Sequence, residues 1–225
     1  MSKWIILLAL LMATTAQAAP PNTYRTPTCF SDVSKLPIYN LTAKLRKTSE
    51  LEINSSVVLI GDNLWRTTAH SVGYNMDAYV MIIAPHKTII AKIWLLDIGR
   101  DVAYLNADST GLTPIPAAST DLKQNETVWN VGYPGLFDMR LLSTEGMFAR
   151  FKKDGRIVVS SIAWGGMSGG ASLRCNGDTL EMLGTITHTK RLILTDKVWT
   201  DNNGVLHREV TYMNSGYAII APIKQ

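Results

Sequence analysis

Short runs of aliphatic, β-branched and aromatic residues, each bounded by turn-forming residues, recur along most of the chain. Such runs are typical of β-strands. The polar segment 42–52 is the one candidate helix. A first set of expected strands lies at residues 55–61, 64–70, 78–84, 87–96 and 101–107.

A break follows at residues 108–121, which are rich in Pro, Ser, Thr and Gly and indicate a linker. A second set of expected strands comes after it, at residues 126–133, 140–151, 155–164, 170–175, 180–189 and 209–222. Regularly spaced short strands on both sides of a linker predict a mostly β chain, with two β-barrels or sandwiches side by side.

The first residues have the layout of a secretory signal peptide. Lys3 precedes an apolar run at 4–13, and the small residues Ala16 and Ala18 fit a cleavage site after residue 18. The run is too short for a stable membrane-spanning helix. We therefore expect residues 1–18 to be a signal peptide, with an uncleaved N-terminal anchor as the alternative, and the mature chain to be periplasmic or secreted.

The charge and the cysteine content indicate which ligands and cross-links the chain can have. Lys and Arg number 22 against 18 Asp and Glu, and the basic residues are scattered, so we expect no nucleic-acid surface. No later stretch is as apolar as the run at 4–13, so we expect no membrane binding after signal cleavage. Two cysteines remain, Cys29 and Cys175. In an exported protein such a pair favours a disulfide over a metal or redox site.

Residues 165–173 read GGMSGGASL, a serine among four glycines with no charged residue. Because glycine weakens regular strands and helices, such a cluster indicates a constrained turn. One interpretation is an ordinary turn in which Ser168 is incidental. The other is a nucleophile on a tight turn, with backbone N–H groups around it that can bind a negatively charged oxygen.

A serine nucleophile needs a base to take its proton and a third group to orient that base. His70 ends one expected strand, and Asp101 begins another, where an unpaired charge would be costly. Asp97 is an alternative acid. The order His70, Asp101, Ser168 would place base and acid in the first β unit and the nucleophile in the second, with the site at their seam.

The motifs around these residues resemble those of trypsin-like (chymotrypsin-fold) serine proteases of the compact bacterial type. TTAH at 67–70, RDVAYL at 100–105 and GMSGGA at 166–171 resemble the family's His, Asp and Ser segments, and VGYPG at 131–135 also recurs in bacterial members. The resemblance covers roughly residues 50–222.

The resemblance implies an all-β fold of two antiparallel β-barrels packed side by side, with a catalytic cleft between them. Its expected parts are an N-terminal arm at 19–49, a first barrel at 50–107, a linker at 108–124, and a second barrel with the C-terminal segment at 125–225.

Carried onto this chain, the resemblance makes His70 the general base, Asp101 its orienting acid and Ser168 the nucleophile. The N–H groups of Gly166 and Ser168 would form the oxyanion hole. Met167 replaces the aspartate that trypsin uses during activation by a newly cut N-terminus, so we do not expect that route here.

By the positions of the resembled family, the substrate pocket is expected near Ile162, Ile186, Thr187 and His188. The isoleucines favour an apolar or uncharged side chain before the cleaved bond, whereas His188 and Arg191 leave acidic specificity open.

The resulting hypothesis is an exported serine endopeptidase that cleaves polypeptides through an acyl-enzyme intermediate, with neither cofactor nor metal. Its alternative is a catalytically inactive peptide-binding protein with a protease fold. An esterase of the α/β-hydrolase type is a third possibility, since the Ser168 motif also fits G-x-S-x-G. Its acid would be Asp196 or Asp201 and its base His207, but no helix is expected after the serine.

Overall fold

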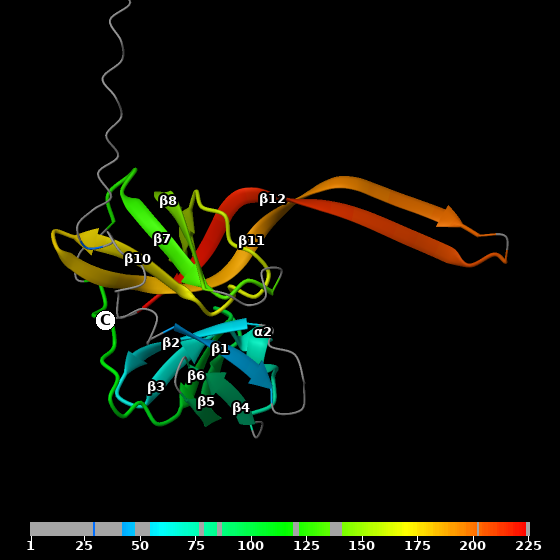
Figure 1. Cartoon of the computed structure of the whole chain (residues 1–225). Helices are drawn as coiled ribbons and strands as arrows, with labels where there is room; N and C mark the ends of the chain where they lie inside the picture. The colour runs from blue at the N-terminus through cyan, green and yellow to red at the C-terminus, as the bar shows by residue number, and fades with distance from the viewer. Residues whose placement is uncertain are drawn as a thin grey trace, which may run out of the picture.

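The strands form two closed antiparallel barrels of six strands each, one above the other in Figure 1. This computed structural model describes residues 29, 42–47, 55–76, 79–84, 87–118, 122–135, 141–201 and 203–223. The expected signal peptide at 1–18 lies outside the described residues. The two-barrel, all-β fold implied by the family resemblance is confirmed.

The first barrel closes in the order β1-β2-β3-β6-β5-β4. Its strands are β1 (Thr42–Lys47), β2 (Ser55–Gly61), β3 (Leu64–Thr67), β4 (Tyr79–Ile83), β5 (Thr88–Asp97) and β6 (Val102–Asn106). Alternation along β5 is regular: Ile89, Ala91 and Ile93 are buried, and the residues between them face solvent. Apolar side chains of period two thus fill this barrel, as a one-sided strand requires.

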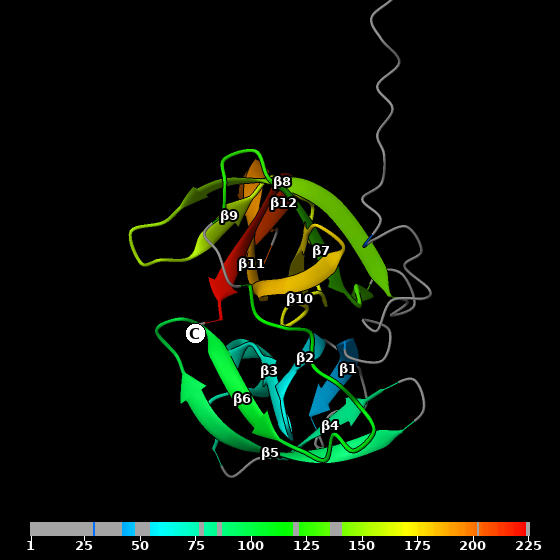
Figure 2. The same cartoon turned by 90° about the vertical axis from the view of Figure 1, so that its left-hand side faces the viewer.

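The second barrel closes in the order β10-β11-β12-β9-β8-β7, seen from its end in Figure 2. Its strands are β7 (Thr127–Gly132), β8 (Leu142–Phe151), β9 (Ile157–Val159), β10 (Ala171–Asn176), β11 (Thr179–Thr200) and β12 (Leu206–Pro222). The buried ion cluster of this barrel centres on Arg174, whose guanidinium donates to Glu181 at 2.9 and 3.0 Å and to Glu126 at 3.3 Å.

The candidate helix at residues 42–52 is wrong where the structure describes it. β1 pairs with β2 on one side and with β4 on the other, so it closes the first barrel. Ala43 and Leu45 are fully buried at a spacing of two, which only a strand allows. Tertiary pairing therefore overrides the local polar composition. β1 lies within the segment 19–49 expected to be an N-terminal arm.

Contacts between the barrels are extensive and specific. One hydrophobic core cluster includes Val57 of β2 together with Val131 of β7 and Leu173 of β10. The buried guanidinium of Arg66 on β3 donates to the carbonyl oxygens of Ala221 and Pro222 at the end of β12, at 3.3 and 3.1 Å. The end of the second barrel is thereby bound to the first.

A long hairpin formed by the outer parts of β11 and β12 projects away from the second barrel (Figure 1). Its turn is closed by Asp201, whose Oδ1 accepts the N–H groups of Asn203 and Val205, each at 2.9 Å. Leu206 and Val205 are exposed at this end. The expected strand 180–189 is therefore only the inner part of β11, whereas the expected strand 209–222 covers nearly all of β12.

A disulfide joins Cys29 to Cys175 at the end of β10, with a Cα–Cα distance of 6.0 Å. The expected pairing is thus present, and it ties the chain ahead of the first barrel to the second barrel.

Candidate active site

The serine-containing loop lies between β9 and β10, where it faces the first barrel. Gly169 has a φ of +83°, and a Cβ there would collide with the Ser56 carbonyl oxygen and the Thr67 hydroxyl. Gly166 has a φ of +96°, and a Cβ there would lie 2.6 Å from the Tyr133 carbonyl oxygen. Both positions therefore require glycine. The cluster is a constrained turn, as the sequence predicts.

Ser56 on β2 holds this loop from the opposite barrel. Its N–H donates to the carbonyl oxygen of Ser168 at 2.8 Å, and its hydroxyl donates to the carbonyl oxygen of Gly166 at 2.9 Å. The same hydroxyl accepts the N–H of Tyr133 at 2.8 Å. Sequence reasoning missed Ser56, because its partners are far away in the chain and no local motif marks it.

His70 lies on the single-turn helix α2 (Ala69–Val72), which follows β3. Asp101 lies in the tight turn between β5 and β6, with a φ of +57°. The Asp101 Oδ2 accepts the His70 Nδ1–H at 2.7 Å, and its Oδ1 accepts the His70 backbone N–H at 3.0 Å. Because an ionised carboxylate only accepts, this pair leaves Nε2 as the unprotonated nitrogen of a neutral ring.

Asp101 is well shielded, with 13% of its side chain exposed against 43% for His70. Burial raises the pKa of Asp101, but the side-chain and backbone hydrogen bonds from His70 outweigh burial and hold the pKa below its usual value. Asp101 therefore stays ionised beside the imidazole at neutral pH.

Asp97, the alternative acid, interacts with Arg100 rather than with His70. Its Oδ1 accepts the N–H of Arg100 at 3.0 Å, and its Oδ2 lies 3.6 Å from the Arg100 guanidinium.

The residues of the esterase alternative lie apart from Ser168. His207 and Asp201 bond to each other at 2.9 Å beside the turn that joins β11 to β12, where Trp199 pairs with His207. The segment after Ser168 is the strand β10 rather than a helix.

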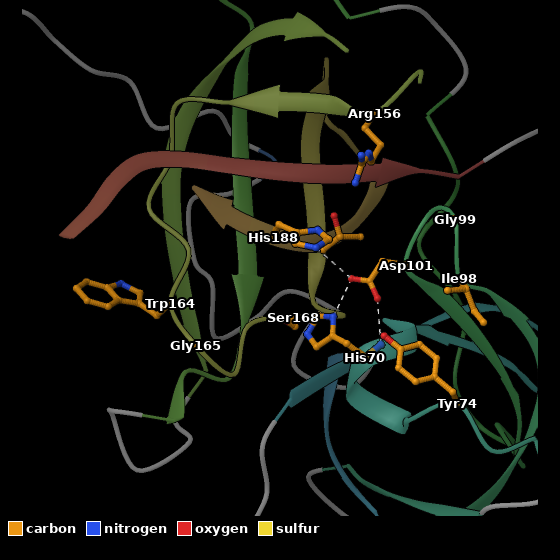
Figure 3. Close-up of a pocket in the computed structure, with 11 residues that line it drawn as sticks. His70, Tyr74, Ile98, Gly99, Asp101, Arg156, Trp164, Gly165, Ser168 and His188 are labelled. Atoms are coloured by element: carbon orange, nitrogen blue, oxygen red, sulfur yellow. Dashed lines mark hydrogen bonds and ion pairs between the residues drawn. The ribbon is translucent and has the colours of Figure 1, made fainter. Parts of the chain in front are cut away.

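His70, Asp101 and Ser168 all line one cleft of about 570 Å³ at the seam of the barrels (Figure 3). His70 Nε2 lies 3.5 Å from the Thr68 hydroxyl, and no hydrogen bond joins it to the Ser168 hydroxyl among the described residues. The N–H groups of Gly166 and Ser168 donate to no protein acceptor in the described part of the chain. Ser168 lines the cleft, whereas Gly166 is not among its lining residues.

Of the four residues expected in a substrate pocket, two line this cleft. Thr187 and His188 are among its lining residues, whereas Ile162 and Ile186 are not. Ile186 is buried, and its backbone carbonyl accepts the N–H of Gly169 at 2.8 Å. The full lining is His70, Tyr74, Ile98, Gly99, Asp101, Arg156, Trp164, Gly165, Ser168, Thr187 and His188.

Arg156 is a cleft residue that the sequence did not mark. Its guanidinium donates to Asp154 at 2.6 and 2.9 Å, which orients it from the turn between β8 and β9. Asp154 and Arg156 are two residues apart around a glycine turn, so their pairing was the available signal. The side chain of Arg191, also considered for specificity, lies outside the described residues.

Metal-ligand clusters and membrane-spanning helices are both absent from the described residues. No group of three or more His, Cys, Asp or Glu side chains there could hold a metal ion. No helix in that part of the chain is long and apolar enough to span a membrane.

Known proteins with a similar sequence or fold show which family the chain belongs to. A family model described as a trypsin-like peptidase domain matches residues 54–180. The serine endoprotease from Yersinia pestis has a similar fold, with a TM-score of 0.61 and 18% identity over 83% of this chain. The present chain covers 60% of that protein's length.

The Rv3671c protease of M. tuberculosis is a second structural relative. Its inactive form matches with a TM-score of 0.59 at 18% identity, covering 82% of this chain and 84% of that one. Its active form matches with a TM-score of 0.60 at 18% identity, covering 82% and 77%. No curated protein sequence matches the chain. At such identities the structural likeness shows a shared fold.

Proposed function

Because the chain belongs to the trypsin-like peptidase family, we propose that it is an exported serine endopeptidase that cleaves polypeptides through a Ser168 acyl-enzyme. One observation carries the proposal. The hydrogen-bonded pair of His70 and Asp101 opens into the same cleft as Ser168, which sits on a turn that only glycines can form.

In the first half of the reaction, the Ser168 hydroxyl attacks the carbonyl carbon of the substrate peptide. Its proton passes to His70 Nε2, and the resulting imidazolium is stabilised by Asp101 through the 2.7 Å bond at Nδ1. The negative oxygen of the tetrahedral intermediate is bound by the N–H groups of Gly166 and Ser168. His70 then protonates the leaving amine, and an ester of Ser168 remains.

In the second half, a water molecule gives its proton to His70 Nε2 and attacks the ester carbon. The same N–H groups bind the second oxyanion, and the proton returns from His70 to the Ser168 oxygen as the acid product leaves. The enzyme is restored. No other group in the cleft is needed for proton transfer.

Export is proposed on two grounds. The N-terminal residues have the layout of a signal peptide, and the disulfide between Cys29 and Cys175 fits an oxidising compartment such as the periplasm or the medium.

One observation favours a second candidate function, a peptide-binding protein without activity. His70 Nε2 faces the Thr68 hydroxyl at 3.5 Å rather than the Ser168 hydroxyl. Catalytic hydrogen bonds often tighten only when substrate binds, so we favour the enzyme.

The deciding experiment is intact-mass spectrometry of the purified protein after treatment with a fluorophosphonate. We expect one added adduct on the native protein, none on Ser168→Ala and none on protein unfolded before treatment. Cleavage of a casein substrate should follow the same pattern. A native protein that takes no adduct and cleaves nothing, yet still binds peptides, would establish the inactive alternative.

A further inference from the structure

The turn between β8 and β9, called the basic turn here, contributes one side chain to the candidate active-site cleft. Residues 152–156 read KKDGR, which is three cations and one carboxylate. The N–H of Lys152 donates to the carbonyl oxygen of Arg156 at 2.7 Å, and the N–H of Gly155 donates to the Lys152 carbonyl oxygen at 2.9 Å. These bonds close the turn, and Arg156 is the residue of the turn that lines the cleft.

Asp154 fixes the Arg156 guanidinium without using all of its donors. The Asp154 Oδ2 accepts from Arg156 Nε at 2.9 Å and from Nη2 at 2.6 Å, and the Lys152 ammonium lies 3.7 Å from the same oxygen. The remaining guanidinium nitrogen, Nη1, has no hydrogen-bond acceptor in the part of the chain that the structure describes. Two cations thus share one carboxylate, and Nη1 is left to donate to a ligand.

The end of the cleft beside Arg156 carries a positive charge. Asp101 is the one acidic residue of the cleft lining, and both of its oxygens accept hydrogen bonds from His70. Burial lowers the pKa of His188, and Asp101 opposes this shift. Arg156 and Lys152 lower that pKa further as positive charges, as does His70. The basic turn therefore acts on the cleft as a cation.

Arg156 reaches the cleft away from the nucleophile. Figure 3 shows its guanidinium pointing from the basic turn toward His188 and Asp101, with Ser168 beyond them. The Arg156 side chain is 19% exposed, so it is anchored in the wall and still open to a ligand. A substrate side chain that meets Arg156 therefore comes from a residue away from the cleaved bond.

We propose that Arg156 binds a carboxylate side chain of the substrate polypeptide, so that the cleft prefers an acidic residue at one position away from the cleaved bond. This inference rests on the proposed peptidase function and assigns a substrate class to it. The carboxylate of Asp or Glu would accept a charge-assisted hydrogen bond from Nη1, and Lys152 would add attraction at longer range. The isosteric amide of Gln can accept the same hydrogen bond but lacks the charge, so it binds more weakly.

The test measures kcat/KM for pairs of short peptides that differ by Glu or Gln at a single position. Each position on either side of the cleaved bond is substituted in turn. For the native protein we expect the Glu peptide to be preferred about 5- to 10-fold at one position, the added strength of a charged over a neutral hydrogen bond. The preference should shrink at about 1 M salt, which screens partly exposed charges.

Two substitutions of Arg156 test its part in this preference. Arg156→Gln should lower the Glu-to-Gln ratio to less than about 2-fold, because the amide keeps a donor but no charge. Arg156→Glu should reverse the preference at the same position, so that a Lys peptide is cleaved faster than the Gln peptide. Arg150→Gln is the matched control, because Arg150 is exposed on β8 just before the basic turn and does not line the cleft. It removes the same charge and should leave the ratio unchanged.

Equal cleavage of the Glu and Gln peptides by the native protein at every position would overturn the inference. A preference that survives in Arg156→Gln, or that Arg150→Gln also removes, would overturn it as well. Failure of the peptidase proposal is a separate result, in which the native protein takes no fluorophosphonate adduct and cleaves neither peptide. The same peptide pairs are then compared by fluorescence anisotropy, and equal Kd values for the Glu and Gln peptides would again overturn the inference.

Discussion

Replacing Gly169 by alanine tests whether the nucleophile loop is shaped by direct contact with the first barrel. A Cβ at this position would collide with the Ser56 carbonyl oxygen and the Thr67 hydroxyl, and would lie 3.0 Å from the Thr67 Cα. Two of these three atoms belong to the backbone, which cannot rotate away as a flexible side chain would. The φ of +83° adds a conformation that L residues rarely adopt.

Two costs therefore add in the folded state. A left-handed backbone at an L residue costs about 1–2 kcal/mol. Forcing a methyl group into a filled space costs about 1–3 kcal/mol. The sum is a loss of about 2–5 kcal/mol in the free energy of unfolding. For a chain of this length, this loss corresponds to a fall in Tm of about 4–20 °C.

Thermal unfolding followed by calorimetry, with urea unfolding followed by tryptophan fluorescence, measures this loss. Gly165→Ala is the matched control, because a Cβ there meets no heavy atom within 4 Å and its φ is outside the left-handed region. It should change stability by less than about 0.5 kcal/mol. Equal stability of the two variants would refute the contact between Gly169 and the first barrel.

Four further predictions concern Asp101, the buried ion cluster and the disulfide. Asp101→Asn should lower kcat by about four orders of magnitude in peptide hydrolysis assays, because the imidazole loses its orienting acceptor. Burial raises the pKa of Asp101, but the hydrogen bonds from His70 outweigh burial and lower it, so ionised Asp101 stabilises the folded state. This stabilisation should disappear as the pH falls below about 4. The Tm values of the native protein and of Asp101→Asn should then converge. Arg174→Met should cost about 3–5 kcal/mol in urea unfolding because it removes the cation beside buried Glu181, and the double variant with Glu181→Leu should recover most of that loss. Replacing Cys29 and Cys175 by serine should cost about 5 kcal/mol in the same assay, since the bond closes a loop of 146 residues.

Local patterns carried most of the fold prediction. The runs at 55–61 and 101–107 coincide closely with β2 and β6, because each is a short, largely buried run of β-branched and apolar residues bounded by turn residues. The outer part of β11, from residue 190 to residue 200, was not predicted, because strands that pair mainly with each other leave no continuous buried face in the sequence. The turn that follows did carry a signal, the Asp201 and Gly204 pair that closes it.

Some residues of the candidate site could be predicted from the sequence, and others could not. His70, Asp101 and Ser168 each sit in a short recognisable motif, so their presence in one cleft could be anticipated. The role of Ser56 could not be anticipated, because it depends on hydrogen bonds to residues that are distant in the chain. The same holds for the bulge in β11 at Thr187, which lies between the pairs Ile186–Ile220 and His188–Ile219. Such contacts become visible only when the barrels are assembled.

The bonds from Ser56 to Ser168 and Gly166 have a consequence for how the protein is made. The second barrel alone would carry a serine with no base, and the first barrel a base with no serine. Under the proposed function, neither barrel alone could therefore hydrolyse a peptide, and the reacting groups would come together only when both barrels had docked. Docking of the barrels would then be the step at which activity appears.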